Sequence, residues 1–181
     1  MWQDDEIDFF DDVSTQKQSK KNKKKEPQLL DESGLRRKAV DLLARREYSF
    51  FEIEKKLLPL AESEELAYSA LEWLTENGLQ SDARFCEMYI RSKAMSGYGP
   101  VRIKQELKQK GISSSLMETC FEEQEIDWSL ELNRLTDKKL NCVDKSDLKA
   151  KQKCMGFLQR RGFSLDQIYK ALDGYYRGEE S

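Results

Sequence analysis

The amino-acid sequence predicts an all-α protein, and three observations carry this prediction. From Asp31 onward apolar residues recur at helical spacing, and no stretch shows the sustained alternation that is typical of strands. Proline occurs only three times in 181 residues, so few positions would interrupt a helix. With 38% hydrophobic and 36% charged residues, the composition favours small helical units with thin cores over one thick core.

Nine helices are expected, and start and stop signals place them in order. Serine hydroxyls suit helix starts because they accept hydrogen bonds from free backbone N–H groups of the first turn. The serines at expected starts are Ser33, Ser49, Ser63, Ser81, Ser113 and Ser164. Glycines suit helix ends, and they stand at Gly78, Gly97, Gly111 and Gly162. The expected helices span residues 33–46, 50–60, 63–77, 81–95, 100–110, 113–124, 127–140, 147–161 and 164–176.

The stretch SGYGPVRIKQELKQKGI, residues 96–112, predicts a short basic amphipathic helix. Pro100 suits its first turn, because the N–H that proline lacks would have no partner there, and Gly111 suits its end. Ile103 and Leu107 lie above one another on one face, while the lysines largely point away from that face. The helix therefore has a narrow buried stripe and a basic outer surface.

A repeat with an offset of 50 or 51 residues runs through the helical part. Ile53, Ile103 and Cys154 occupy one position of it, and the turns KGI and RGF close two matching helices. We therefore expect three tandem three-helix units, which stack because units this small bury little surface alone. The expected division is a tail over 1–32, a first unit over 33–79, a second over 80–125 and a third over 126–181.

The composition of residues 1–32 predicts a disordered, charged tail. MWQDDEIDFFDD is acidic with embedded aromatic residues, and STQKQSKKNKKKEPQ is rich in lysine. Blocks of like charge with little apolar content do not form a packed core. Three roles stay open: a solubilising segment, docking of Trp2, Ile7, Phe9 and Phe10 in a partner groove, or contact of the lysines with phosphate.

The composition argues against an enzyme and against a metal or cofactor site. The chain has no histidine, which is the commonest general base and metal ligand, and its four cysteines form no CxxC pair. It also lacks a phosphate-binding glycine loop, a dinucleotide-binding motif and a Ser-His-Asp set. Cys86 and Cys120 fall on apolar helix positions, which predicts buried free thiols. Without a signal peptide or an apolar run of membrane length, we expect a cytoplasmic protein with no membrane contact.

Three segments resemble the RecX family, whose members modulate the RecA recombinase. YGPVRIKQELKQKGIS, preceded by DARFCEMYIRSKAMSG, resembles the central repeat of that family. LLARREYSFFEIEKKL is similar to the first-repeat signature, and FLQRRGFSLDQIYKAL to the ending of the third repeat. The resemblance covers about residues 35–176. It implies an elongated, curved molecule that binds along the groove of the RecA–single-stranded DNA filament and inhibits its ATP hydrolysis, strand exchange and co-protease activity.

The sequence departs from the family pattern in two places. The tail lies outside it, and the linker after Leu57 (LPLAESEE) lacks the Lys-Gly turn of the second unit. This leaves open how the second and third helices of the first unit connect.

Charge is uneven along the chain although the net charge is only −3. Residues 81–112 hold seven basic against three acidic residues and 144–161 hold six against two, whereas 31–78 hold seven against eleven. Outward basic residues of the second and third units are therefore our candidates for contact with the filament or DNA: Arg91, Lys93, Arg102, Lys104, Lys108, Lys149, Lys151, Lys153, Arg160 and Arg161.

We expect a buried core at Ile103, Leu107, Leu158, Phe163, Ile168 and Leu172. Residues expected to shape turns rather than bind are Gly97, Gly99, Pro100, Gly111 and Gly162.

Two other functions are open on the sequence alone. A stand-alone nucleic-acid-binding module would use its short helix pairs like helix-turn-helix units and would grip DNA without a recombinase. A structural scaffold would show neither behaviour. The acidic overall charge disfavours the DNA-only function, so we expect weak binding to single-stranded DNA by the chain alone. We also expect a monomer, although the sequence does not fix the oligomeric state.

Overall fold

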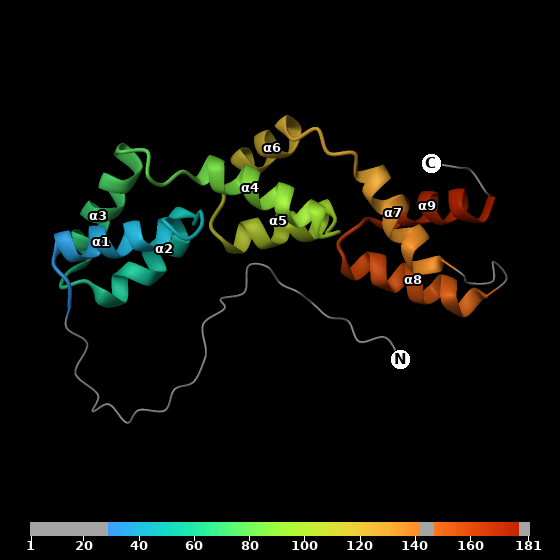
Figure 1. Cartoon of the computed structure of the whole chain (residues 1–181), viewed down its shortest axis with the longest axis horizontal. Helices are drawn as coiled ribbons and strands as arrows, with labels where there is room; N and C mark the ends of the chain where they lie inside the picture. The colour runs from blue at the N-terminus through green and yellow to red at the C-terminus, as the bar shows by residue number, and fades with distance from the viewer. Residues whose placement is uncertain (1–28, 142–146, 178–181) are drawn as a thin grey trace, which may run out of the picture.

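The structure, a computed structural model, describes residues 29–141 and 147–177, and within these ranges it is all-α (Figure 1). Its elements are α1 (Glu32–Leu43), α2 (Phe50–Leu57), a 3₁₀ helix η1 (Leu58–Leu60), α3 (Glu64–Glu76), α4 (Asp82–Met95), α5 (Pro100–Gln109), α6 (Ser114–Glu123), α7 (Trp128–Leu140), α8 (Leu148–Arg160) and α9 (Leu165–Arg177). The predicted all-α class is confirmed. Residues 1–28 of the tail predicted over 1–32 lie outside the described residues.

Most helix starts follow from side-chain caps, whereas α5 begins with Pro100 after the uncapped Gly99. The Ser49 hydroxyl accepts from the Glu52 N–H while the Glu52 carboxylate accepts from the Ser49 N–H, which forms a capping box. One predicted start was wrong: α1 is capped by Asp31, whose carboxylate accepts from Gly34 N–H at 2.8 Å. Ser33 therefore lies inside the first turn. An aspartate carboxylate caps a helix as well as a serine hydroxyl does, so two adjacent candidates competed here.

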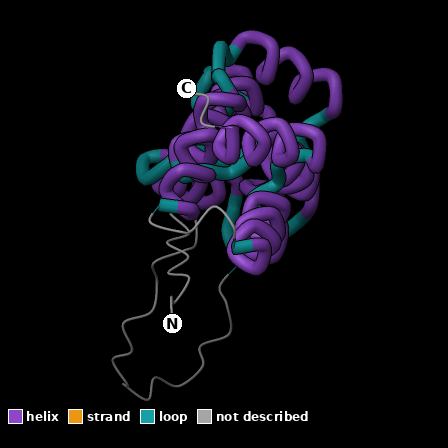
Figure 2. The backbone as a smooth tube through the Cα atoms, turned by 90° about the vertical axis from the view of Figure 1, so that its right-hand side faces the viewer, coloured by secondary structure: helices purple, strands orange, loops and turns teal. Residues whose placement is uncertain are grey.

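The helices are grouped into three small cores that follow one another along the long axis of the molecule (Figure 1). The first core lies within α1–α3 around Leu35 and Ile53, the second within α4–α6 around Tyr89 and Ile103, and the third within α7–α9 around Leu158. Seen along the long axis, the described chain consists of helices and connecting loops (Figure 2). The arrangement is elongated, as predicted.

The residues predicted to be core are buried, which confirms the helical registers. They are Ile103, Leu107, Leu158, Phe163, Ile168 and Leu172. Cys86 and Cys120 are buried free thiols, as expected, and burial raises the pKa of each. Cys142 lies outside the described residues.

The connection that the sequence left open in the first unit is a short 3₁₀ turn followed by extended chain. Leu30 N–H donates to Leu60 O at 2.7 Å, and Glu62 N–H donates to Leu30 O at 3.2 Å. These bonds tie the start of the described chain to the α2–α3 connection. A backbone bridge therefore replaces the Lys-Gly turn that closes α5.

The second and third helices of the units occupy different sides of the molecule. In Figure 1, α2, α5 and α8 run along the lower side, whereas α3 and α6 lie on the upper side. The second helices α2, α5 and α8 therefore form one line along the molecule.

Candidate functional site

The ends of α5 and α8 meet at a joint made by backbone groups. Gly99 N–H donates to Arg161 O at 2.7 Å, and Val101 N–H donates to Gly162 O at 3.1 Å. The first N–H groups of α5 have no partner within their own helix, and neither do the last carbonyls of α8. The joint between the second and third units therefore pairs N–H groups at the start of α5 with carbonyls of the turn that ends α8.

Glycine is required on both sides of this joint. A Cβ on Gly99 would lie 2.5 Å from Gly162 O, and one on Gly162 would lie 2.6 Å from Arg102 N. Gly162 also has a φ of +90°, a left-handed conformation that L side chains rarely adopt. We predicted that these glycines shape turns. The structure adds that the second and third units meet through them.

The joint between the first and second units has a similar design. The Ser49 hydroxyl, which caps α2, donates to Lys110 O at the end of α5 at 2.7 Å. Phe50 N–H donates to the Asp82 carboxylate at 2.8 Å, and a Cβ on Gly111 would lie 2.6 Å from the Cβ of Phe51. The starts of α2 and α5 thus meet the turns that end α5 and α8, so α8, α5 and α2 lie head to tail.

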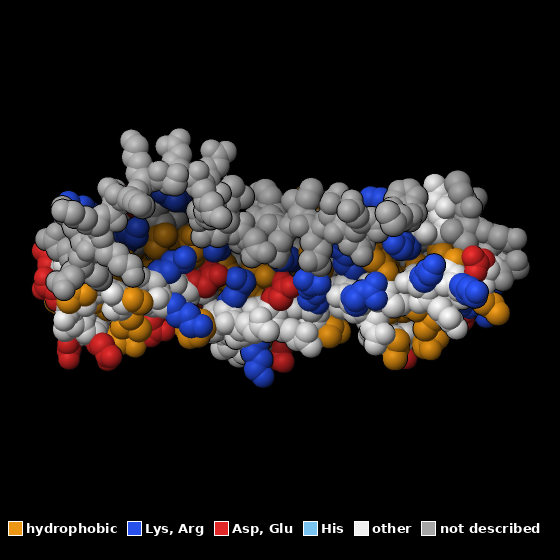
Figure 3. All heavy atoms as spheres, turned by 90° about the horizontal axis from the view of Figure 1, so that it is seen from below, with side chains coloured by type: hydrophobic (Ala, Val, Ile, Leu, Met, Phe, Trp, Pro, Cys, Tyr) orange, Lys and Arg blue, Asp and Glu red, His pale blue; other side chains and the backbone are white. Residues whose placement is uncertain are grey.

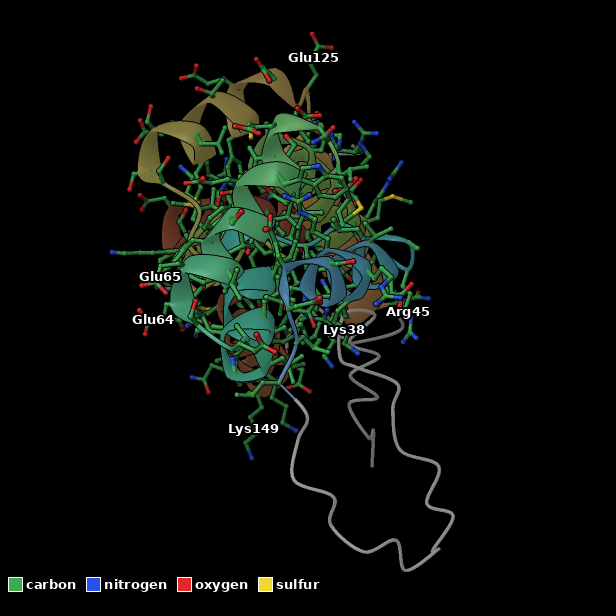
Figure 4. All side chains as sticks on the ribbon, turned by 90° about the vertical axis from the view of Figure 1, so that its left-hand side faces the viewer. Lys38, Arg45, Glu64, Glu65, Glu125 and Lys149 are labelled. Atoms are coloured by element: carbon green, nitrogen blue, oxygen red, sulfur yellow. The ribbon has the colours of Figure 1, made fainter. Side chains whose placement is uncertain are left out.

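Charge differs between α3 and α6, which are third helices, and α8, which is a second helix. The third helices α3 and α6 contain no lysine or arginine, whereas α8 contains no aspartate or glutamate. Lys and Arg side chains spread along the face seen from below (Figure 3). Lys149 on α8 projects from this lower side, and Glu125, which follows α6, projects from the opposite side (Figure 4).

The structure brings five of the ten predicted site residues onto the line of second helices as exposed side chains. We call this set the basic row: Lys104, Lys108, Lys149, Lys153 and Arg160. Arg91 is also exposed, but it lies on α4 with its Nε 3.4 Å from the Gln124 side-chain oxygen, outside the row. Lys151 is half-buried on α8, with its Nζ 4.7 Å from the ring centre of Tyr176.

The prediction that the Lys93 side chain faces outward was wrong. It is only 4% exposed, and its Nζ lies 3.4 Å from the Glu106 carboxylate and 4.9 Å from the ring centre of Tyr98. A lysine stem can pack along apolar surface while its ammonium group finds a carboxylate. Since the last turn of α4 faces α5, Lys93 belongs to the packing of the second unit.

Arg102 and Arg161 are both half-buried and both contact Tyr98. Their guanidinium carbons lie 4.3 and 4.7 Å from the Tyr98 ring centre, within the range of cation–π attraction. Arg161 also donates to Ser96 O at 3.0 Å, and Arg102 donates to Arg160 O at 3.4 Å. Both arginines therefore stabilise the joint between the second and third units. The signal in the sequence was an aromatic residue between two glycines, Gly-Tyr-Gly, which we interpreted only as a turn.

Glu106 is the carboxylate at the centre of this cationic group. It accepts from Arg102 Nε at 2.8 Å and from the Tyr89 hydroxyl at 2.6 Å, and Lys93 Nζ lies 3.4 Å away. Burial acts to raise the pKa of Glu106, but the hydrogen bonds from Arg102 and Tyr89 and the charge of Lys93 outweigh it. The pKa of Glu106 is therefore below its ordinary value.

Replacement of Glu106 by glutamine is expected to lower the free energy of unfolding at neutral pH by about 2 kcal/mol, because charged hydrogen bonds are lost. A lowered carboxylate pKa stabilises the fold above the ordinary value of 4.5, and this contribution is lost as pH falls below it. Urea unfolding between pH 7 and pH 3 measures both effects. The parent chain should lose stability more steeply with acid than Glu106→Gln, and Glu118→Gln on the exposed face of α6 should behave like the parent. Equal acid sensitivity of parent and Glu106→Gln contradicts the prediction.

Comparison with known proteins decides the family. The chain is 38% identical over 140 residues to a protein named Regulatory protein RecX from Pseudomonas entomophila, with 77% of this chain and 90% of that protein covered. A protein of the same name from Pseudomonas putida strain GB-1 is 39% identical over the same length and coverage. This chain belongs to the RecX family.

Family models and solved structures place the RecX features on the fold. The model for the second three-helix domain of RecX matches residues 81–120, and the model for the third matches residues 132–172. The crystal structure of RecX from Lactobacillus salivarius superposes with a TM-score of 0.69 at 25% identity, covering 79% of this chain and 97% of that one. Another RecX crystal structure, at 23% identity and a TM-score of 0.64, shares the fold.

RecX family membership makes this chain a regulatory protein and not an enzyme. Within residues 29–141 and 147–177, none of the helices has the length and apolar character needed to cross a membrane.

Proposed function

We propose that this chain binds the filament that RecA forms on single-stranded DNA and inhibits its ATP hydrolysis, strand exchange and co-protease activity. Membership in the RecX family supports the partner. The observation that supports the proposal is the basic row, because its exposed cations belong to α5 and α8, which meet end to end. A nucleoprotein filament presents phosphates and acidic protein surfaces along a helical groove, and a line of cations is complementary to both.

The head-to-tail joints give this surface the stiffness that inhibition needs. An elongated protein that contacts several neighbouring protomers at once gains avidity, provided that its contact points keep their spacing. The backbone bonds from Gly99 and Val101 to the turn after α8 hold the second and third units at one spacing. Bridged protomers would then resist the rearrangements that ATP turnover requires.

The proposal is tested by ATP hydrolysis of RecA on a saturating single-stranded oligonucleotide while this chain is titrated in. We expect the rate to fall at substoichiometric ratios, because one bound chain affects more than one protomer. Raising the salt concentration should weaken the effect, since exposed charges are screened. An unchanged rate at equimolar chain overturns the proposal.

A parallel gel-shift with the bare oligonucleotide distinguishes the alternative function. A filament modulator binds the oligonucleotide much more tightly when RecA is present. A stand-alone nucleic-acid-binding module binds the bare oligonucleotide with the same affinity as the RecA-coated one. We propose weak binding to bare single-stranded DNA by a monomer, which sedimentation of the free chain checks.

A further inference from the structure

The first unit carries two exposed lysines on the helix that continues the basic row. Lys55 and Lys56 lie on α2, the second helix of that unit, and both are exposed. The net charge of residues 31–78 is negative, and for this reason none of our candidates came from the first unit. The structure shows where that negative charge lies.

Of the acidic residues in the first unit, two lie on α2 and four exposed ones lie on α3, while Asp41 on α1 and Glu62 before α3 are exposed as well. Glu52 pairs with Lys110 Nζ at 2.7 Å, and Glu54 accepts from the Tyr68 hydroxyl at 2.7 Å, so both carboxylates of α2 have partners. Exposed acidic residues without a basic neighbour in their helix lie on α3: Glu64, Glu65, Glu72 and Glu76. Figure 4 shows Glu64 and Glu65 together on one side of the first unit. On α2 itself the exposed charged side chains are therefore Lys55 and Lys56, whereas both carboxylates are half-buried.

The contacts at the first joint connect these lysines with the row. Lys55 Nζ lies 4.2 Å from the ring centre of Phe51, and the Cβ of Phe51 approaches the Gly111 turn. Lys108 of the row stands three residues before that turn. Phe51 thus contacts Lys55 and approaches the turn that follows Lys108.

We infer that Lys55 and Lys56 extend the basic row into the first unit, and that the extended row binds the phosphates of a single DNA strand. The inference rests on the proposed function, since it assigns further contacts to the same surface. The helices α8, α5 and α2 have 13, 10 and 8 residues, and at about 1.5 Å per residue they form a line on the order of 50 Å long. A phosphate backbone is a linear polyanion with regularly spaced charges. A line of separated lysines is therefore more complementary to a phosphate backbone than to a compact acidic patch on a protein.

The test is the salt dependence of binding to a fluorescein-labelled oligo(dT), followed by anisotropy of the full chain without RecA. Each phosphate contact to a single strand contributes about 0.7 to the slope of log K against log salt. Lys55→Glu with Lys56→Glu should therefore reduce the slope by about 1.4 and weaken binding about 20-fold at 0.1 M salt. The variant Lys55→Arg with Lys56→Arg should keep both values.

The matched control reverses the same amount of charge away from the row. Lys170 and Arg177 are exposed on α9, the third helix of the third unit, and their double replacement by glutamate should leave the slope unchanged. Equal losses in the two double variants would mean that only the net charge matters and would overturn the inference. Normal oligo(dT) binding by Lys55→Glu with Lys56→Glu, together with weaker inhibition of RecA, would assign these lysines to the protein surface and would also overturn it. Failure of the proposed function would appear separately, as a parent chain that binds oligo(dT) but leaves the ATPase of RecA unchanged.

Discussion

Replacement of Gly162 by alanine is expected to destabilise the fold by about 4 kcal/mol and to separate the second and third units. The left-handed conformation of Gly162, at φ +90°, accounts for about 1 to 2 kcal/mol. The rest comes from overpacking, about 1 to 3 kcal/mol, because the new Cβ would lie 2.6 Å from Arg102 N. That atom belongs to a helix and has little freedom to move. The hydrogen bond from Val101 N–H to Gly162 O should be lost first.

Gly78→Ala is the matched control for this prediction. Gly78 has a similar φ of +66°, but its added Cβ would have no atom within 4 Å. This variant should therefore lose only the conformational contribution, about 1 kcal/mol. Urea unfolding measures both losses, and small-angle scattering should show a changed radius of gyration for Gly162→Ala alone. Equal losses in the two variants would mean that the joint does not restrain the third unit.

Replacement of Lys104, Lys108, Lys149 and Lys153 by glutamate is expected to weaken inhibition of the RecA filament by roughly 10²- to 10³-fold at 0.1 M salt. Each lysine that neutralises a phosphate of a single strand contributes about 0.7 decades of affinity at that concentration relative to 1 M salt. All four side chains are exposed and none belongs to a buried core, although Lys104 Nζ lies 4.9 Å from the ring centre of Phe121 at the edge of the second core. The concentration of chain that halves the ATPase rate measures the effect.

The corresponding four arginine replacements keep the charge and serve as the control. They should inhibit within a few-fold of the parent chain, because a phosphate contact needs a cation and not a particular shape. Circular dichroism should show unchanged helix content in both variants. Undiminished inhibition by the glutamate variant would remove the basic row from the binding surface and leave the family assignment intact.

The two expected results concern different properties of one surface. Gly162 sets the position of α8 relative to α5, and the lysines provide the charge that this position aligns. Gly162→Ala should therefore inhibit RecA less than the parent chain even though every lysine is present, because avidity depends on the spacing of the contact points.

The helices and the core could be predicted from the sequence because their signals are local. A serine hydroxyl caps the helix that follows it, and an apolar residue repeats on one face every three or four positions, so Ser49, Ile103 and Leu107 needed no tertiary information. The family resemblance likewise rested on contiguous motifs. The exception, Ser33, was a choice between two neighbouring caps that differ little in free energy.

The basic side chains were harder to predict, because their exposure depends on what packs against each helix. Lys104 and Lys93 are both lysines of predicted amphipathic helices, yet one is exposed and the other is only 4% exposed beside Glu106. Periodicity distinguishes an apolar face from a polar one. It does not reveal whether a neighbouring helix brings a carboxylate to the edge of that face.

The sequence by itself determined the helices, the apolar faces and the family of this protein, because each depends on residues close together in the chain. Only the tertiary structure decided that α8, α5 and α2 lie head to tail and that Arg102 and Arg161 pack on Tyr98. These contacts join groups about 60 residues apart. They arise because the free N–H groups that begin one helix and the free carbonyls that end another must find partners, and the fold selects which ends meet.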